Sequence, residues 1–172
     1  MDRQVPRRRR VTGMSALKDV KLIYPHENNV PARMSGERDT AIADLIRESS
    51  FHPLNDDNGP YCLELSICNK HLVLQIKNLD NKNLPAFMLS LNPYRRIVKD
   101  YFLIIEAYEK ARAEGIHGRL EPIDMARRAL HNEAAELLKD RLADKITMDH
   151  ETARKLFTLI CVLHMDQPRL WR

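Results

Sequence analysis

The stretch "FMLSLNPYRRIVKDY", residues 87–101, decides the fold class, because the spacing of its apolar residues changes part-way along. Up to Leu91 the apolar residues alternate with others, as they do in a half-buried strand. Asn92-Pro93 is a favourable helix start, and beyond it the apolar residues recur every three or four positions. We predict that a sheet ends here and a run of helices begins.

The residues before this junction predict strands. Residues 61–68 alternate between apolar and other side chains, and residues 72–76 do so again. Asn69-Lys70 lies between these two runs and predicts a hairpin turn, although Asn-Gly would be the stronger signal. Further towards the N-terminus, we predict a strand within residues 14–24 and a helix that begins at an N-cap Ser35 and stops near Ser49.

The residues after the junction predict three helices. The first follows Pro93, the second spans about 121–144, and the third spans 151–164 behind an N-cap at Asp149. The third is apolar nearly all round, so it is either central or part of a subunit interface. The side chains predicted to form a homodimer contact there are Leu156, Phe157, Ile160 and Leu163. Strands followed by helices predict an α+β fold, in which an antiparallel β-meander with an added N-terminal strand packs against three to four helices.

Length and composition indicate one globular domain over residues 14–172. The chain has 172 residues, of which 44% are hydrophobic and 30% are charged. No apolar run approaches the roughly 20 residues needed to cross a bilayer, so we predict no membrane association. Three cysteines without a disulfide framework predict reduced thiols and a cytoplasmic location.

The formal net charge of +4 belongs to residues 1–13, and the rest of the chain is electrically balanced. This segment includes Arg7, Arg8, Arg9 and Arg10 and has no apolar pattern, so we predict a disordered basic tail. Three interpretations of the tail stay open. It is an arm that binds nucleic acid or another acidic surface, a solvated tail with no dedicated role, or an overextended reading frame whose true start is Met14. Outside the tail, nucleic-acid binding is not indicated, because the folded part carries no basic excess.

Four runs of the chain resemble one protein family. They are "GPYCLELSI", "LSLNPYRRIVKDYFLI", "IDMARRALHNEAAELLKDRL" and "DHETARKLFTLICVLH". Together they are similar to uncharacterised protein family 0262, a group of small alphaproteobacterial proteins of unknown function. The resemblance covers roughly residues 15–164. It implies no activity, cofactor or catalytic residue, so any functional hypothesis rests on the residues themselves.

The arginines of the junction are candidates for an anion-binding site. Cations are unexpected in the first turn of a helix, which carries partial positive charge. Backbone N–H groups at this helix start can receive a phosphate or carboxylate, with Arg95, Arg96 and Lys99 closing over it. Arg128, on the following helix, is a fourth candidate. The alternative is that these cations form surface ion pairs, and an Arg96–Asp100 pair would remove one of them from the site.

His131 is the weak candidate for a catalytic residue. Glu133 lies two positions further on and projects from the far side of the same helix, so the two cannot act as an acid–base pair. The alternative is a histidine that is hydrogen-bonded where the helix contacts another element. No zinc-ligand spacing, glycine-rich phosphate loop or nucleophile motif is present, so we predict no metal and no cofactor.

Three hypotheses for the function follow. The leading one is a binding or regulatory module that recognises a small anion or a protein partner near the arginine clusters. The second is an enzyme on a phosphate or carboxylate substrate, with His131 as acid–base and Arg95 and Arg128 as clamps. The third is nucleic-acid binding through Arg7–Arg10.

Overall fold

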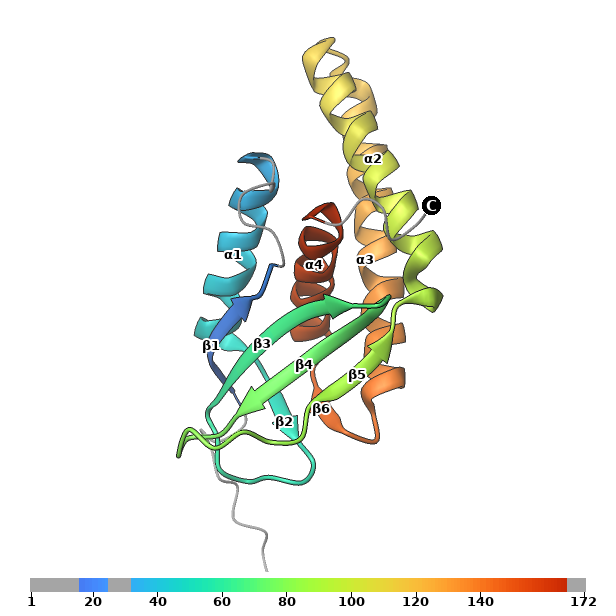
Figure 1. Cartoon of the computed structure of the whole chain (residues 1–172). Coiled ribbons are helices and arrows are strands. Elements are labelled where there is room, and N and C mark those ends of the chain that lie inside the picture. The colour runs from blue at the N-terminus through green and yellow to red at the C-terminus, as the bar shows by residue number, and fades with distance from the viewer. Residues whose placement is uncertain (1–15, 25–31, 167–172) are drawn as a thin grey trace, which may run out of the picture.

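The structure is a computed structural model, and it describes residues 16–24 and 32–166 (Figure 1). The predicted basic tail, its arginines Arg7–Arg10 and the alternative start at Met14 lie outside the described residues. The described part contains four α-helices and six strands, so the predicted α+β class is confirmed. No helix within this part is long and apolar enough to cross a membrane.

The strands form two sheets. The larger has the order β1-β3-β4-β5, and the smaller pairs β2 with β6 in antiparallel fashion. Their bounds are β1 Leu17–Leu22, β2 Phe51–Pro53, β3 Tyr61–Cys68, β4 His71–Lys77, β5 Phe87–Ser90 and β6 Ile146–Met148.

The β3–β4–β5 meander is antiparallel, as predicted, and its first turn has the predicted sequence. Asn69 and Lys70 have φ angles of 48° and 63°, so both central residues of the turn adopt the left-handed conformation of a type I′ hairpin. The added N-terminal strand β1 differs from the others, because it pairs parallel with β3. A parallel pair needs a crossover connection, and α1 lies in that connection.

The helices follow the predicted order with shifted boundaries. Their bounds are α1 Ala32–Glu48, η1 Asn92–Tyr94, α2 Arg95–Ala113, η2 His117–Arg119, α3 Leu120–Leu142 and α4 His150–Asp166, where η1 and η2 are short 3₁₀ helices. The prediction that Ser35 caps the start of α1 is wrong, because the helix already begins at Ala32. The predicted cap at Asp149 is confirmed, since its Oδ1 accepts a hydrogen bond of 2.8 Å from the backbone N–H of Thr152.

Helix α4 stands in the middle of the helical layer, with α1 on one side and α3 on the other (Figure 1). The apolar sequence of α4 predicted either a central helix or a helix in a subunit interface, and the helix is central. The side chains predicted to form a dimer contact, Leu156, Phe157, Ile160 and Leu163, are all buried within the single chain. Packing inside the chain therefore accounts for the apolar character of α4 without a second subunit.

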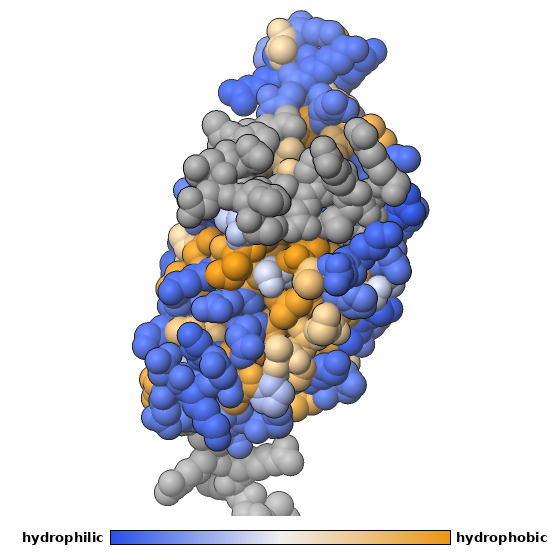
Figure 2. Space-filling model, viewed as in Figure 1, coloured by the Kyte–Doolittle hydropathy of each residue, from blue (hydrophilic) through white to orange (hydrophobic). Residues whose placement is uncertain are grey.

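One contiguous core joins both sheets and all four α-helices. The helices cover one face of the larger sheet, to which β3 contributes Leu63 and Leu65. The other face is open, and Figure 2 shows hydrophobic residues over its middle with hydrophilic residues around them. One cross-strand row on this open face runs through Ser66, Val73 and Met88.

The antiparallel α2–α3 pair extends beyond the other helices (Figure 1). This changes which side chains of α3 are buried. Ala126 of α3 is exposed, and the buried residues of this helix begin only at His131. Helix α3 packs against α4 and also contacts strand β6. His131 is therefore the first buried position of α3, where the helix enters the body of the protein.

Candidate functional site

The cations at the start of α2 lie on the surface rather than around a cavity. Arg95, Arg96 and Lys99 are all exposed. Arg96 forms the anticipated ion pair with Asp100, at 3.2 Å between Nη1 and Oδ2, and its other amino group donates a hydrogen bond to the Glu133 carboxylate on α3. Two carboxylates therefore already neutralise Arg96.

Arg128 is held in the same way on α3. Its Nη2 lies 3.0 Å from the Asp124 carboxylate, which also accepts a hydrogen bond of 2.9 Å from Arg127. The Arg127 guanidinium, with a smaller contribution from Arg128, holds the pKa of Asp124 below its ordinary value. Arg96, Arg127 and Arg128 thus form ion pairs within α2 and α3 and between these helices.

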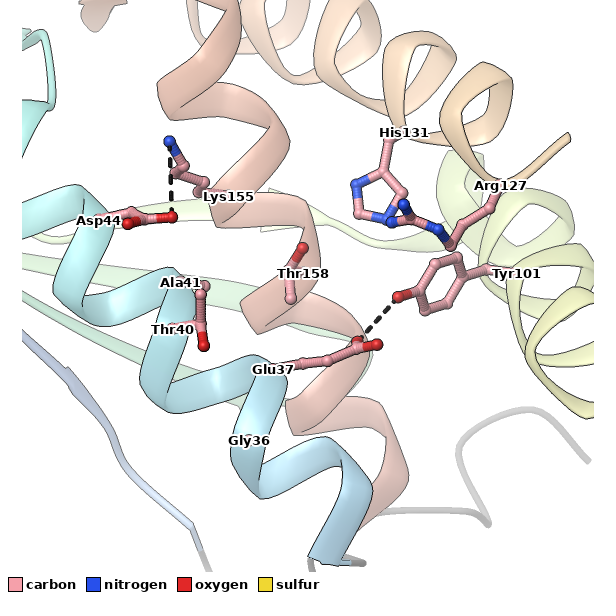
Figure 3. Close-up of a pocket in the computed structure, with 10 residues that line it drawn as sticks. All are labelled: Gly36, Glu37, Thr40, Ala41, Asp44, Tyr101, Arg127, His131, Lys155 and Thr158. Carbon is pink, nitrogen blue, oxygen red and sulfur yellow. Dashed lines mark hydrogen bonds and ion pairs between the residues drawn. The ribbon is translucent and has the colours of Figure 1, made fainter. Parts of the chain in front are cut away.

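A pocket of about 380 Å³ lies between the helices at a different place (Figure 3). Helix α4 forms its floor, α1 forms one wall, and α2 and α3 form the other. We call it the four-helix pocket. It is lined by Gly36, Glu37, Thr40, Ala41 and Asp44 of α1, Tyr101 of α2, Arg127 and His131 of α3, and Lys155 and Thr158 of α4. Of the residues predicted from the sequence, His131 is in this set, whereas Arg95, Arg96, Lys99 and Arg128 are not.

His131 is buried in the wall of the pocket, with 5% of its surface exposed. The edges of two aromatic rings hold the imidazole, with ring centroids at 5.1 Å for Tyr101 and 5.4 Å for Phe157. The ring interacts with the backbone carbonyl of Arg154, which favours a proton on the imidazole, and Nε2 has no hydrogen-bond partner among the described residues. We therefore assign the donating nitrogen as Nδ1–H, which leaves Nε2 as a pure acceptor.

Burial fixes this protonation state. Loss of hydration, reinforced by the nearby positive charges of Arg127 and Arg154, lowers the pKa of His131 from 6.5 to about 4. The imidazole is thus neutral at pH 7. A buried acceptor without a donor costs free energy, of the order of 1–3 kcal/mol, and in this protein that acceptor is at a pocket wall.

Glu37 and Tyr101 connect the two walls of the pocket. The Tyr101 hydroxyl donates a hydrogen bond of 3.0 Å to Oε2 of Glu37, as Figure 3 shows. Tyr101 itself is buried, and burial raises the pKa of its phenol. Its hydroxyl therefore stays protonated and continues to donate, so the Glu37 carboxylate is anchored at this end of the pocket.

Lys155 lies at the other end and is only loosely held. Its Nζ is 3.9 Å from oxygens of both Asp44 and Glu48. That separation gives electrostatic attraction but exceeds the 2.7–3.2 Å of a hydrogen bond. The short contacts to the same two carboxylates, at 2.9 and 3.0 Å, are made by Arg47. The ammonium group of Lys155 is thus near the pocket with unused donors.

Glu37, Tyr101 and Lys155 were not predicted as site residues. They come from three helices that are far apart in the sequence, and no local spacing connects them. Tyr101 also reads as an ordinary core aromatic, which it is in part. His131 was the one residue of this pocket that the sequence singled out, and it is the first buried residue of α3.

The described residues contain no group of three or more His, Cys, Asp or Glu side chains that could hold a metal ion. Another pocket, of about 440 Å³, lies on α2 and α3 between Leu103, Ala126 and Leu130 and is mostly apolar. The four-helix pocket differs from it in combining both signs of charge with a buried polar side chain.

Comparison with known proteins identifies the family. The model of UPF0262, an uncharacterised protein family, matches residues 15–166. The chain belongs to the UPF0262 family.

Members from several alphaproteobacteria are similar to it. A UPF0262 protein of Rhizobium etli is 51% identical over 128 residues, which are 74% of this chain and 82% of the relative. A UPF0262 protein of Agrobacterium fabrum is 49% identical with the same coverage. Another, from Brucella anthropi, is 49% identical over 129 residues, covering 74% of this chain and 81% of the relative. No solved structure matches the chain. The match confirms the resemblance seen in the sequence. The family has no known function, so the function has to be inferred from the structure.

Proposed function

We propose that this UPF0262 protein is a binding module for a small polar molecule, and that the molecule occupies the four-helix pocket. The observation that carries the proposal is the His131 Nε2 acceptor, which is buried at the pocket wall and has no hydrogen-bond partner in the part of the chain that the structure describes. Buried polar groups in proteins are nearly always hydrogen-bonded, and exceptions call for an explanation. A bound ligand that donates a hydrogen bond supplies one.

The size and make-up of the pocket support the same proposal. About 380 Å³ falls within the roughly 300–1,000 Å³ typical of small-molecule sites. The polar groups come from four helices, so a ligand there would contact every helix of the fold. Such a ligand would stabilise the packing of α1, which contacts α4 and β1, against α2 and α3.

We propose binding rather than acid–base catalysis. An acid–base group works best with a pKa near the operating pH, and burial takes His131 well below it. The clamps suggested by the sequence, Arg95 and Arg128, do not line the pocket. We also propose the cytoplasm as the compartment, in keeping with the free thiols of Cys62, Cys68 and Cys161.

The test is a thermal-shift screen of the full chain against amino acids, amines, carboxylates and phosphates, using two variants of α1. Thr40→Phe puts an aromatic ring at the pocket from an exposed position. Ala43→Phe adds the same ring at an exposed position of the same helix that does not line the pocket. We expect a compound that stabilises the wild type and the Ala43→Phe variant but not the Thr40→Phe variant. A ligand at 100 times its dissociation constant adds about 2.7 kcal/mol. Equal stabilisation of both variants would place the ligand elsewhere and refute the proposal.

A further inference from the structure

The hydrogen-bonding groups that remain available to a ligand differ between the two ends of the four-helix pocket, although Asp44 lies beside Lys155 and Arg127 lies beside His131 (Figure 3). Glu37 and His131 lie towards one end, near Tyr101, and Lys155 lies towards the other, with Thr158 between them. We infer that the pocket takes a small zwitterion of the α-amino-acid class, with its ammonium group at Glu37 and His131 and its carboxylate at Lys155. This inference rests on the proposed function and specifies the ligand.

The end at Glu37 and His131 accepts hydrogen bonds. A carboxylate offers about four lone-pair sites, and the Tyr101 hydroxyl uses one on Glu37. With the proton of the neutral His131 ring assigned to Nδ1, on the side of the Arg154 carbonyl, Nε2 can only accept. A ligand group between two acceptors must bring more than one donor. An ammonium group has three N–H donors and a positive charge that complements Glu37.

Tyr101 contacts both accepting groups. Its ring packs against the His131 ring at 5.1 Å between centroids, and its hydroxyl is 3.0 Å from the Glu37 carboxylate. One aromatic side chain thus contacts both groups. Arg127 lies beside this end, where its guanidinium is already bound to Asp124. Its positive charge opposes protonation of His131 and so keeps Nε2 an acceptor.

The end at Lys155 donates hydrogen bonds. At 3.9 Å the Lys155 ammonium makes no hydrogen bond to Asp44 or Glu48, whose short contacts are with Arg47. The Thr158 hydroxyl makes one long contact of 3.4 Å to the Arg154 carbonyl. A ligand carboxylate would therefore give Lys155 a charge-assisted bond that its present neighbours do not provide.

The charge balance of the lining favours a zwitterion over a phosphate. The ionic side chains that line the pocket are two acids, Glu37 and Asp44, and two bases, Arg127 and Lys155. A doubly charged anion would bring its charge next to both carboxylates. A zwitterion adds no net charge to this balanced lining, and it would place its ammonium group next to Glu37 and its carboxylate next to Lys155.

The experiment is isothermal titration calorimetry of the full chain with the standard L-amino acids, one at a time, and with inorganic phosphate. For any amino acid that binds, two derivatives are titrated next. Its methyl ester lacks the carboxylate charge, and its N-acetyl form lacks the ammonium group. We expect each derivative to bind at least tenfold more weakly than the parent amino acid.

Two variants locate the ends of the ligand, and each has a matched control. Glu37→Gln removes the charge at the accepting end but can still accept from Tyr101, and Glu106→Gln makes the same change on the exposed surface of α2. Lys155→Met removes the ammonium at the donating end but retains the length of the chain. Its control, Lys99→Met, also tests the anion site predicted from the sequence. We expect the dissociation constant to rise at least tenfold in each pocket variant and to be unchanged in each control.

The possible failures are distinguishable. If phosphate or simple carboxylates bind in the pocket and no amino acid does, the ligand class is wrong while the binding module stands. If an amino acid binds but neither Glu37→Gln nor Lys155→Met weakens it, the assigned ends are wrong. If no compound of any class binds, both this inference and the proposed function fail.

Discussion

Replacing His131 by Asn is expected to make the stability of the protein less sensitive to acid. Burial lowers the pKa of His131 in the folded state to about 4, while the unfolded chain has the ordinary value near 6.5. Below pH 6.5 the unfolded state therefore binds a proton that the folded state excludes, and the folded state loses stability as the pH falls towards 4. Above pH 6.5 the imidazole is neutral in both states and contributes nothing to the pH dependence.

The size of the effect follows from these two values. While only the unfolded state is protonated, each pH unit costs about 1.4 kcal/mol. Between pH 7.5 and pH 5, the loss due to His131 amounts to about 2 kcal/mol. His164 on α4, whose burial also lowers its pKa to about 4, adds a comparable loss that remains in the variant. His131→Asn should therefore lose about 2 kcal/mol less than the wild type over this interval.

Asn is the chosen replacement because its side-chain amide can donate to the Arg154 carbonyl from near the position of Nδ1, but does not titrate. The assay is urea denaturation followed by far-UV circular dichroism at pH 7.5 and pH 5. The variant loses the aromatic contacts of the ring, so only the change between the two pH values is compared. The control is His117→Asn, whose ring is exposed, and it is expected to behave as the wild type. If the wild type and His131→Asn lost the same stability to within about 0.5 kcal/mol, a neutral buried imidazole would be ruled out.

Three further substitutions test the fold and the site. Tyr101→Phe removes the donor to Glu37 and should lower the free energy of unfolding by about 1 kcal/mol in urea denaturation, so an unchanged midpoint would argue against that hydrogen bond. Lys70→Gly relieves a left-handed residue in the β3–β4 turn and should raise stability by about 0.5–1 kcal/mol in a thermal melt, whereas a loss would mean that the turn is not type I′. Asp149→Ala removes the cap that accepts from Thr152 and should cost about 1 kcal/mol, whereas Asp149→Asn should retain most of it in the same melt.

Features that depend on neighbouring residues could be predicted from the sequence. The alternation of residues 61–77 defines the β3–β4 hairpin, because side chains of a strand point to opposite faces in turn. The cap at Asp149 is equally local. The smaller sheet was missed for the opposite reason. Its strands Phe51–Pro53 and Ile146–Met148 have three residues each, too few for a period to be visible. They meet because α1, which β2 follows, packs against α4, which β6 precedes. The parallel pairing of β1 with β3 likewise depends on the crossover connection through α1, and the residue pattern within β1 does not predict the direction of pairing.

The candidate site likewise depends on contacts between residues that are distant in the sequence. Dense charge in the sequence, as at Arg95-Arg96 and Arg127-Arg128, first suggested a place for an anion. Such charge is often neutralised by acids one turn away or on the next helix, and Asp100, Glu133 and Asp124 do this here.

His131 pointed to the candidate site for a different reason. It is a polar residue at a buried position where an apolar side chain would pack. The Arg154 carbonyl interacts with its ring and favours a proton there, as expected for a structural histidine. Its Nε2 has no partner among the described residues, and an apolar residue at this position would avoid that cost as well as the loss of stability in acid. The empty protein is therefore destabilised by an unsatisfied acceptor beside a pocket that holds both signs of charge. A ligand that donates a hydrogen bond to Nε2 would remove this destabilisation. If the ligand donates to Nε2, its binding should be weaker to His131→Phe than to wild type even though the empty variant is no less stable, a combination that a purely structural histidine would not produce.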